Sequence, residues 1–234
     1  MNGVFECTEK QIEEMKQYRK KMEDKGIFDI DEYKLRFKFK AANIPEIMWD
    51  KKINDLREFK DRNLILVYIK NFKLALQDGA GIYFHGSYGV GKTFTACIIA
   101  MEAIRQNYSV YYIAMPDFIS TLSKTYNDRN AEDKFNIQME ETDFLILDEL
   151  GREYTGVKNQ LSPMITLKLD SILRHRINNN KSTIITTNIV NLDDLKQLYS
   201  DSILSCIIGA CEMILIEGKD QRIAGSEKKW KNIN

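Results

Sequence analysis

The sequence predicts an α/β fold, with a parallel sheet of about five strands, helices on both of its faces and a short helical extension before it. Short apolar runs alternate along the chain with longer stretches of helical periodicity, a pattern typical of a parallel sheet buried on both sides. A glycine-rich loop separates a strand from a helix at 86–93, and an acidic pair ends a later apolar strand. The length of 234 residues suits one such domain plus an appendage.

The start of the chain, residues 1–40, is dense in charged side chains and holds no proline. Thr8 and Gln11 form a capping-box pattern, apolar side chains follow at helical spacing, and Gly26 is the expected stop. The apolar stripe is narrow and terminal, which leaves two interpretations open. The helix either packs on its own domain or binds a partner. We assign residues 1–45 to a helical N-terminal extension and linker that docks a partner.

The remaining elements follow within a core domain predicted over 46–225, before a basic tail at 226–234. A connector with a proline break is predicted over 41–56, and a helical stretch over 63–76. The predicted strands are 81–85, 109–115, 143–150, 182–188 and 211–218. The predicted helices that alternate with them are 93–106, 116–126 and 161–177.

Composition limits the classes of protein that this chain can belong to. The formal net charge is zero, which excludes a uniformly basic nucleic-acid coat and is compatible with a local basic groove. No apolar run approaches the roughly 20 residues of a membrane helix, and the N-terminus lacks the apolar core of a signal peptide, so we expect a cytoplasmic protein. Cys7, Cys97, Cys206 and Cys211 form no C-x-x-C pair, and we expect reduced thiols rather than a zinc site.

The glycine-rich loop matches the pattern G-x-x-x-x-G-K-[ST] at every fixed position. Its glycines let backbone N–H groups turn toward phosphate oxygens, and the following helix points its positive end at the same anion. We expect Lys92 to reach the β- and γ-phosphates of ATP and the Thr93 hydroxyl to bind Mg²⁺. The predicted nucleotide-binding residues are Gly86, Ser87, Tyr88, Gly89, Val90, Gly91, Lys92, Thr93 and Phe94.

Polar residues at two further strand ends complete the predicted site. Asp148 and Glu149 end the strand 143–150, and ligands bind at this edge of parallel sheets. We expect Asp148 to hold Mg²⁺, directly or through water, and Glu149 to polarise the attacking water as general base. Asn188 ends the strand 182–188, where its amide would orient water near the γ-phosphate; taken alone, an asparagine there is more often a turn residue.

In this order the motifs resemble those of AAA+ P-loop ATPases, and more specifically the DnaC/DnaI group of helicase loaders within the IstB-like ATPases. The resemblance covers roughly residues 42–223. It rests on the stretches "NIPEIMW", "GIYFHGSYGVGKTFTACIIA", "FLILDELG", "LDSILRHRINNNKSTIITTN" and "CEMILIEGKDQR". It implies an AAA+ core without a large lid domain, for which the chain also leaves little room after the last strand.

The resemblance also implies a function. In this family an ATPase core assembles side by side, an N-terminal appendage grips the hexameric replicative helicase, and the ring is loaded onto single-stranded DNA. ATP would hold the assembled state and hydrolysis would release it. Two alternatives stay open: an IstB-type ATPase that serves a transposase, and a nucleotide-dependent binding switch that hydrolyses ATP slowly.

The chain departs from this family in the arginines expected to act on ATP. By resemblance, Arg222 falls at the position of a second sensor. The family's trans-acting arginine before the last strand is replaced by Cys206. Either Arg174, Arg176 or Arg152 acts across a subunit interface instead, or hydrolysis is slow. For Arg174 and Arg176 the alternative is a favourable contact with the carboxyl end of their helix.

Contacts with DNA are predicted from aromatic residues in charged surroundings. The segment 122–135 combines charge with Tyr126 and Phe135, which could stack on bases; a solvated linker is the alternative. The tail sequence "SEKKWKN" is basic with one tryptophan, and we expect a disordered tail there.

Overall fold

The structure is a computed structural model that describes residues 8–26, 29–125, 128–151 and 162–221. Five of the residues singled out from the sequence lie outside these ranges, as does the basic tail. They are Cys7, Tyr126, Arg152, Arg222 and Trp230. Within the described ranges, no helix is both long enough and apolar enough to cross a membrane.

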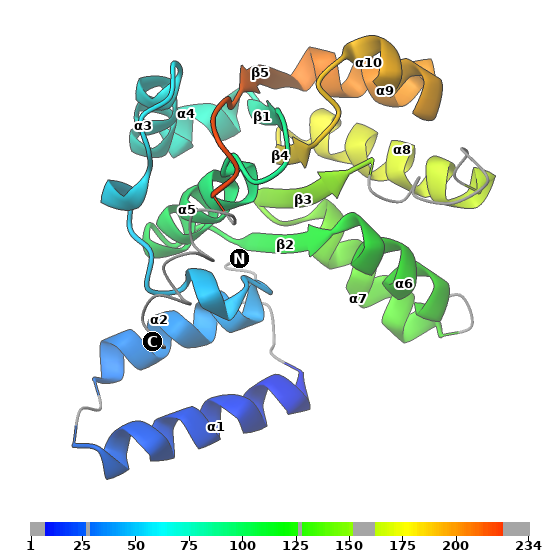
Figure 1. Cartoon of the computed structure of the whole chain (residues 1–234). Helices are drawn as coiled ribbons and strands as arrows, with labels where there is room; N and C mark the ends of the chain where they lie inside the picture. Colours follow the sequence, from blue (N-terminus) through cyan, green and yellow to red (C-terminus); the bar gives the residue numbers. More distant parts are fainter. Residues whose placement is uncertain (1–7, 27–28, 126–127, 152–161, 222–234) are drawn as a thin grey trace, which may run out of the picture.

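A five-stranded sheet forms the centre of the molecule (Figure 1). Its strands are β1 (Gly81–His85), β2 (Val110–Ala114), β3 (Phe144–Leu150), β4 (Ser182–Thr187) and β5 (Cys211–Leu215). They lie in the order β2-β3-β4-β1-β5, and every pairing is parallel. The predicted fold class is thereby confirmed. The last strand ends three residues earlier than the predicted 211–218, at Leu215.

Helices cover both faces of the sheet, because successive strand residues point into two separate apolar cores. Ile82 and Phe84 enter one core, whereas Tyr83 between them enters the other. The first core is covered by α3 (Arg62–Lys70), α4 (Phe72–Gln77) and α5 (Lys92–Arg105). The second is covered by α6 (Met115–Thr125), α7 (Arg129–Glu140), α8 (Pro163–Asn178), α9 (Leu192–Leu198) and α10 (Asp201–Ala210).

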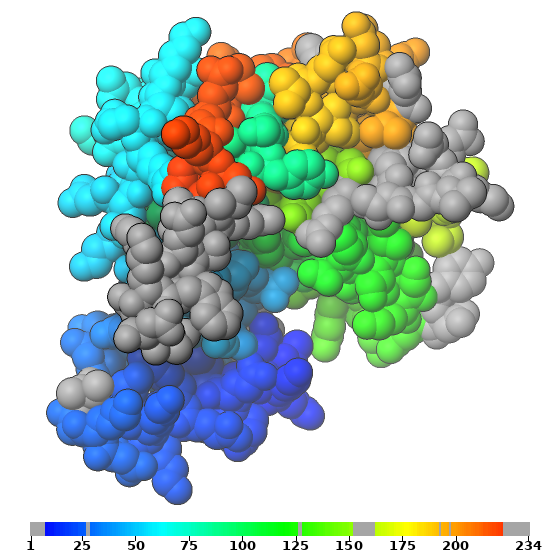
Figure 2. Space-filling view, in the orientation of Figure 1, coloured from blue at the N-terminus to red at the C-terminus, as the bar shows by residue number. Residues whose placement is uncertain are grey.

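The N-terminal extension consists of two helices, α1 (Glu9–Asp24) and α2 (Ile30–Ala41), which Figure 2 shows as a lobe at the bottom of the view. The predicted capping box is present: the backbone N–H of Gln11 donates to the Thr8 hydroxyl, and the Gln11 side chain accepts from the Thr8 N–H. Met15 is the buried residue of α1, and Phe39 that of α2. Two short 3₁₀ turns follow in the connector, η1 (Glu46–Met48) and η2 (Ile53–Asp55).

The connector also covers an edge of the sheet. Strand β2 is an edge strand, so the backbone groups of its outer side have no neighbouring strand to pair with. The Tyr112 N–H donates to the Ala42 carbonyl at 2.9 Å, and the Asn43 side-chain amide donates to the Tyr112 carbonyl at 3.0 Å. Asn43 adopts a φ of 60°, a conformation that asparagine tolerates better than most residues. The chain after α2 is thus joined to the sheet at Tyr112.

Two expectations about the middle of the chain were wrong. The helical stretch 63–76 is broken at Asn71 into α3 and α4. The segment 122–135 is not a linker, because it holds the end of α6 and the start of α7, which Asp128 caps. Phe135 is 2% exposed and packs on Phe118 with the ring centroids 5.6 Å apart, so it cannot stack on DNA bases.

Candidate nucleotide-binding site

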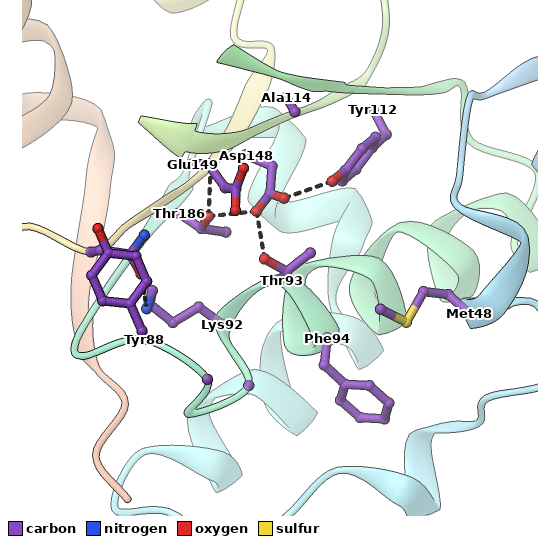
Figure 3. A pocket seen from close by; sticks show the side chains of 13 residues that line it. Met48, Tyr88, Lys92, Thr93, Phe94, Tyr112, Ala114, Asp148, Glu149 and Thr186 are labelled. Atoms are coloured by element: carbon purple, nitrogen blue, oxygen red, sulfur yellow. Dashed lines mark hydrogen bonds between the residues drawn. The ribbon is translucent and has the colours of Figure 1, made fainter. Parts of the chain in front are cut away.

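A cavity of about 330 Å³ opens at the carboxyl ends of the strands, between the loop after β1 and the ends of β3 and β4 (Figure 3). This is the edge at which parallel α/β sheets bind ligands. The residues that line it are Met48, Tyr88, Gly89, Gly91, Lys92, Thr93, Phe94, Tyr112, Ala114, Asp148, Glu149, Thr186 and Asn188. The two sequence motifs and the strand-end asparagine therefore meet at one place.

Two glycines allow the backbone of the loop 86–91 to adopt positive φ angles. Gly91, with a φ of 105°, caps the start of α5, and Gly89 has a φ of 72°. A Cβ atom on Gly89 would lie 1.9 Å from the carboxylate of Asp220, which follows β5. The Gln221 N–H donates to the Gly89 carbonyl at 3.0 Å. The residues after β5 therefore hold the loop from outside, and a side chain at position 89 would be strained and would require Asp220 to move.

Lys92 lies at the centre of the loop and is 6% exposed. Its ammonium group donates to the carbonyls of Gly86 at 2.8 Å and Ser87 at 2.6 Å, and to Oδ1 of Asn188 at 2.7 Å. These three acceptors match the three protons of the group. Phosphate oxygens are stronger acceptors for the same protons, so an anionic ligand in the cavity can replace them.

Asp148 is 3% exposed, and both of its carboxylate oxygens accept hydrogen bonds from hydroxyl groups (Figure 3). Oδ1 accepts from Thr93 at 2.8 Å and from Thr186 at 2.5 Å. Oδ2 accepts from Tyr112 at 2.6 Å. A buried carboxylate needs such donors, since burying an unpaired charge is costly.

The donor set beside the loop fits Mg²⁺. The Thr93 hydroxyl and the Asp148 carboxylate are hard oxygen ligands that lie in contact, next to the expected position of the phosphates. Among the described residues there is no group of three or more His, Cys, Asp or Glu side chains that could hold a metal ion alone. Mg²⁺ commonly keeps water and phosphate ligands and needs only one or two from the protein, so two oxygens suffice.

Glu149 is directed by an irregularity in β3. The pairing of β3 with β4 shifts between Leu147 and Leu150, and Glu149 lies in this bulge with a φ of 60°. The Glu149 N–H donates to the Thr186 hydroxyl at 3.0 Å. Bulges re-aim side chains, which is how two consecutive acidic residues both line the cavity despite the alternation of a regular strand.

The remaining loop residues differ in what they contribute. Tyr88 and Phe94 have side chains on the cavity wall, and Tyr88 is 65% exposed. Val90 is buried in the apolar core, and Gly86 and Ser87 present carbonyls to Lys92 rather than lining the cavity.

Sequence reasoning missed several of the lining residues, namely Met48, Tyr112, Ala114 and Thr186. Thr186 lies two residues before Asn188 at the same strand end, a signal that could have been used. Tyr112 and Met48 come from an edge strand and from the connector. No motif marks these two positions in the sequence.

Arg176 is not a trans-acting arginine, because the structure buries it completely, at 0% exposure. Its guanidinium donates to the carbonyls of Met139, Thr142 and Ser182 at the amino ends of the strands, away from the cavity. Burial lowers its pKa to about 9, which leaves it protonated at neutral pH. Arg174 is exposed and donates to Asp170 at 3.0 Å and to Ser202 at 2.5 Å.

The described cysteines are free thiols. Cys97 and Cys206 are buried, and Cys211 is partly buried. Burial raises the pKa of the Cys211 thiol to about 12 and raises that of Cys97 further, so both are protonated and unreactive at neutral pH.

Known proteins with similar sequences include a family of ATP-binding proteins and a helicase loader. The sequence model of the family described as IstB-like ATP binding protein matches residues 39–228. The replicative helicase loader DnaI of Bacillus subtilis is 30% identical over 126 residues, which are 53% of this chain and 38% of that protein. An ATP-binding protein of insertion sequence IS5376 from Geobacillus stearothermophilus is 30% identical over 124 residues, 53% of this chain and 46% of that protein. Each of these matches spans less than half of the relative's length.

Solved structures agree on the fold. The crystal structure of the DnaC helicase loader superposes with a TM-score of 0.64 and 26% identity, over 74% of this chain and 100% of that one. The replication initiator DnaA bound to AMPPCP and single-stranded DNA superposes with a TM-score of 0.60, over 77% of this chain and 54% of that one. That protein is 19% identical to this chain, and the likeness shows a shared fold alone.

Proposed function

We propose that this chain, which belongs to the family of IstB-like ATP binding proteins, is an ATPase with a loading function. It would load a hexameric replicative helicase onto single-stranded DNA. The observation that carries the nucleotide part is the convergence of Lys92, Thr93 and Asp148 on one cavity. The relatives named as helicase loaders support the loading part.

In this proposal each cavity residue has one role. Lys92 exchanges its carbonyl and amide acceptors for the β- and γ-phosphates of ATP. Thr93 and Asp148 hold Mg²⁺, which when bound neutralises charge on the phosphate oxygens. Glu149 accepts a proton from the attacking water, and Asn188, released from Lys92, orients that water. Arg222 would act as a second sensor.

The partner is the finer part of the proposal. Sequence identity does not separate a helicase from a transposase as the partner, since the DnaI and IS5376 relatives are each 30% identical to this chain. The match to the DnaC helicase loader, over the whole of its crystallised chain and 74% of this chain, supports the loader. The extension 1–45 is the proposed docking element, 46–225 the ATPase domain and 226–234 the tail. Phe39, Ala42 and Ile44 lie in the core, whereas α1 contributes Met15 as its buried residue, so α1 is the part of the extension most available to a partner.

Self-assembly through the ATPase domain is proposed with Arg174 as the arginine that acts on a neighbouring subunit. Its side chain is 54% exposed, at the end of α8. If this is correct, Arg174→Ala lowers ATP turnover only at protein concentrations where the subunits associate. Lys181→Ala is the control, because that lysine is also a cation paired with an aspartate, Asp143. Equal turnover of both variants at high concentration would exclude Arg174.

The deciding experiment is native mass spectrometry of the protein mixed with the replicative helicase of its host, with ATP and without nucleotide. The same measurement is made with Glu149→Gln. This variant should hydrolyse ATP about 10²–10⁴-fold more slowly without loss of ATP binding, and so accumulate the ATP-bound complex. Lys92→Ala, whose affinity for ATP should be about 100-fold lower, is the control. A loader gives a defined complex with the helicase. No complex in either condition contradicts the loader and makes a transposase the next partner to test.

A slowly hydrolysing switch is the second candidate, and the residue that favours it is Cys206. By resemblance, this buried thiol falls at the position of the family's trans-acting arginine. An arginine of that kind contributes about 10³–10⁵-fold to rate in other P-loop proteins. Turnover that stays slow with single-stranded DNA and helicase present would favour the switch, whereas stimulation by either would favour the loader.

A further inference from the structure

Tyr112 is unusual in that its side chain and its backbone bind two different parts of the molecule. The hydroxyl donates to Asp148 inside the cavity, while the backbone N–H and carbonyl bind the turn after α2. We propose that Tyr112 is a positioning residue, which fixes the Asp148 carboxylate for Mg²⁺ and connects it to the N-terminal extension. This inference rests on the proposed nucleotide-binding function of the cavity.

The geometry of the Asp148 carboxylate depends on donors from three elements. Thr93 from α5 and Thr186 from β4 donate to Oδ1, and Tyr112 from β2 donates to Oδ2 (Figure 3). Donors on both oxygens, from three separate elements, fix the rotation of the carboxylate. Without Tyr112 the two threonines share one oxygen and the other oxygen loses its donor. The carboxylate would then be free to turn away from the position it needs beside Thr93.

Tyr112 is also linked to the N-terminal extension through its backbone. The inner edge of β2 pairs with β3, with Ala114 opposite Asp148. On the outer edge, Ala42 and Asn43 take the place of a neighbouring strand at Tyr112. Phe39, three residues before Ala42, is buried in the same core as the Tyr112 ring. A displacement of α2 therefore moves the backbone of the residue whose hydroxyl holds Asp148.

A consequence follows for a partner that docks on the extension. If docking shifts α2, it changes the affinity of the cavity for Mg²⁺ and its nucleotide. By linkage, binding of Mg²⁺ and nucleotide changes the affinity for the partner by the same factor. Met48, in η1 of the same connector, also lines the cavity and gives this segment a second contact with the site.

The test measures binding of a fluorescent ATP analogue as a function of Mg²⁺ concentration, in Tyr112→Phe and in a matched control. The control is Tyr111→Phe, the same change one residue earlier, where the ring enters the opposite core. We expect Tyr112→Phe to raise the Mg²⁺ concentration for half-maximal binding about tenfold, the lower range for a hydrogen bond to a charged group. Binding in EDTA, which depends on the loop and Lys92, should stay within about twofold of wild type.

Asn43→Gly tests the connection without touching the cavity. Glycine accepts the φ of 60° and removes only the side-chain hydrogen bond to Tyr112. We expect a shift of about threefold in the same direction, and a double variant with less than the product of the two effects, because both act through one residue. The thermal midpoint of each variant, measured without nucleotide, shows that it is folded.

The outcomes are distinguishable. No shift for Tyr112→Phe relative to Tyr111→Phe overturns the positioning role and leaves the nucleotide site intact. A shift for Tyr112→Phe with none for Asn43→Gly overturns the link to the extension. An equal loss of binding with Mg²⁺ and in EDTA indicates a merely structural role. A wild-type protein that binds no nucleotide overturns the proposed function and this inference with it.

Discussion

Two cations are buried at opposite ends of the same sheet, and they serve different purposes. Lys92 lies at the carboxyl ends of the strands with 6% exposure, and Arg176 lies at the amino ends with none. Both donate hydrogen bonds to backbone carbonyls. Both would be costly to bury without those partners.

The difference is whether the partners can be exchanged. The acceptors of Arg176 are carbonyls and hydroxyls of packed elements, among them Met139, Thr142 and Ser182, and none of these three residues lines the nucleotide cavity. The acceptors of Lys92 belong to a loop and a strand end that border the cavity. A buried cation is thus a binding site only where a ligand can replace its acceptors. Elsewhere it stabilises the fold.

The strongest test of this comparison is Arg176→Ala. The variant leaves several buried carbonyls without donors, and we expect a loss of about 3–5 kcal/mol in the free energy of unfolding. In a domain of this size that corresponds to a fall of about 6–20 °C in the thermal midpoint. Urea and thermal unfolding followed by circular dichroism measure it. Arg174→Ala, two residues earlier and exposed, is the control and should change the midpoint by about 1 °C or less. A stable Arg176→Ala would mean that the amino-end cation is dispensable.

Lys92→Ala should affect ATP affinity much more than stability, which is the reverse of Arg176→Ala. We expect ATP affinity to fall about 100-fold, because the cation that meets the phosphates is lost, while the thermal midpoint without nucleotide changes by about 3 °C or less. Equilibrium titration with a fluorescent ATP analogue and a thermal scan of the same sample give both numbers. If Lys92→Ala were as destabilising as Arg176→Ala, the two cations would not differ in kind.

Gly89→Ala sharpens the comparison, because the shape of the loop decides where the acceptors of Lys92 lie. The added Cβ meets Asp220 and the φ of 72° becomes strained. We expect about a tenfold loss of ATP affinity, since left-handed backbone costs about 1–2 kcal/mol outside glycine. Gly89→Ala combined with Asp220→Ala should regain part of it. If the double variant binds no better than the single one, contact with the residues after β5 does not shape the loop.

The smallest effect concerns strain at the cavity end. At the amino ends of the strands Asn180 has a positive φ, which asparagine tolerates. At the cavity the residue with a positive φ is Glu149. Glu149→Gly should therefore raise the free energy of unfolding by about 0.5–1 kcal/mol, which is the strain relieved less the entropy cost of glycine. Chemical denaturation measures it, and Glu149→Gln, which keeps the Cβ, should show no gain. A destabilised glycine variant would argue against stored strain at this position.

The features that the sequence predicts well depend on residues that are close together in the chain. The loop 86–93 and Asp148 follow from motifs whose residues are consecutive, and the strands follow from apolar runs bounded by polar residues. The burial of Arg176 depends on how the starts of β3 and β4 meet α8, which no local pattern contains. The contact of Tyr112 with Asp148 depends on the register of β2 against β3. Helix α7 was missed because its apolar positions, Phe135 and Met139, are few among many polar ones.

The turn at Ala42 and Asn43 has a consequence for how this protein can be handled. A fragment that begins at residue 46, the predicted start of the core domain, would lack the groups that cover the outer edge of β2. The exposed N–H and carbonyl of Tyr112 would then be open to pairing with a strand of another molecule, the usual route to aggregation. Loss of helicase binding in such a fragment could reflect insolubility instead of a missing docking helix. A truncation that begins within α2, before Phe39, removes α1 and keeps the edge covered.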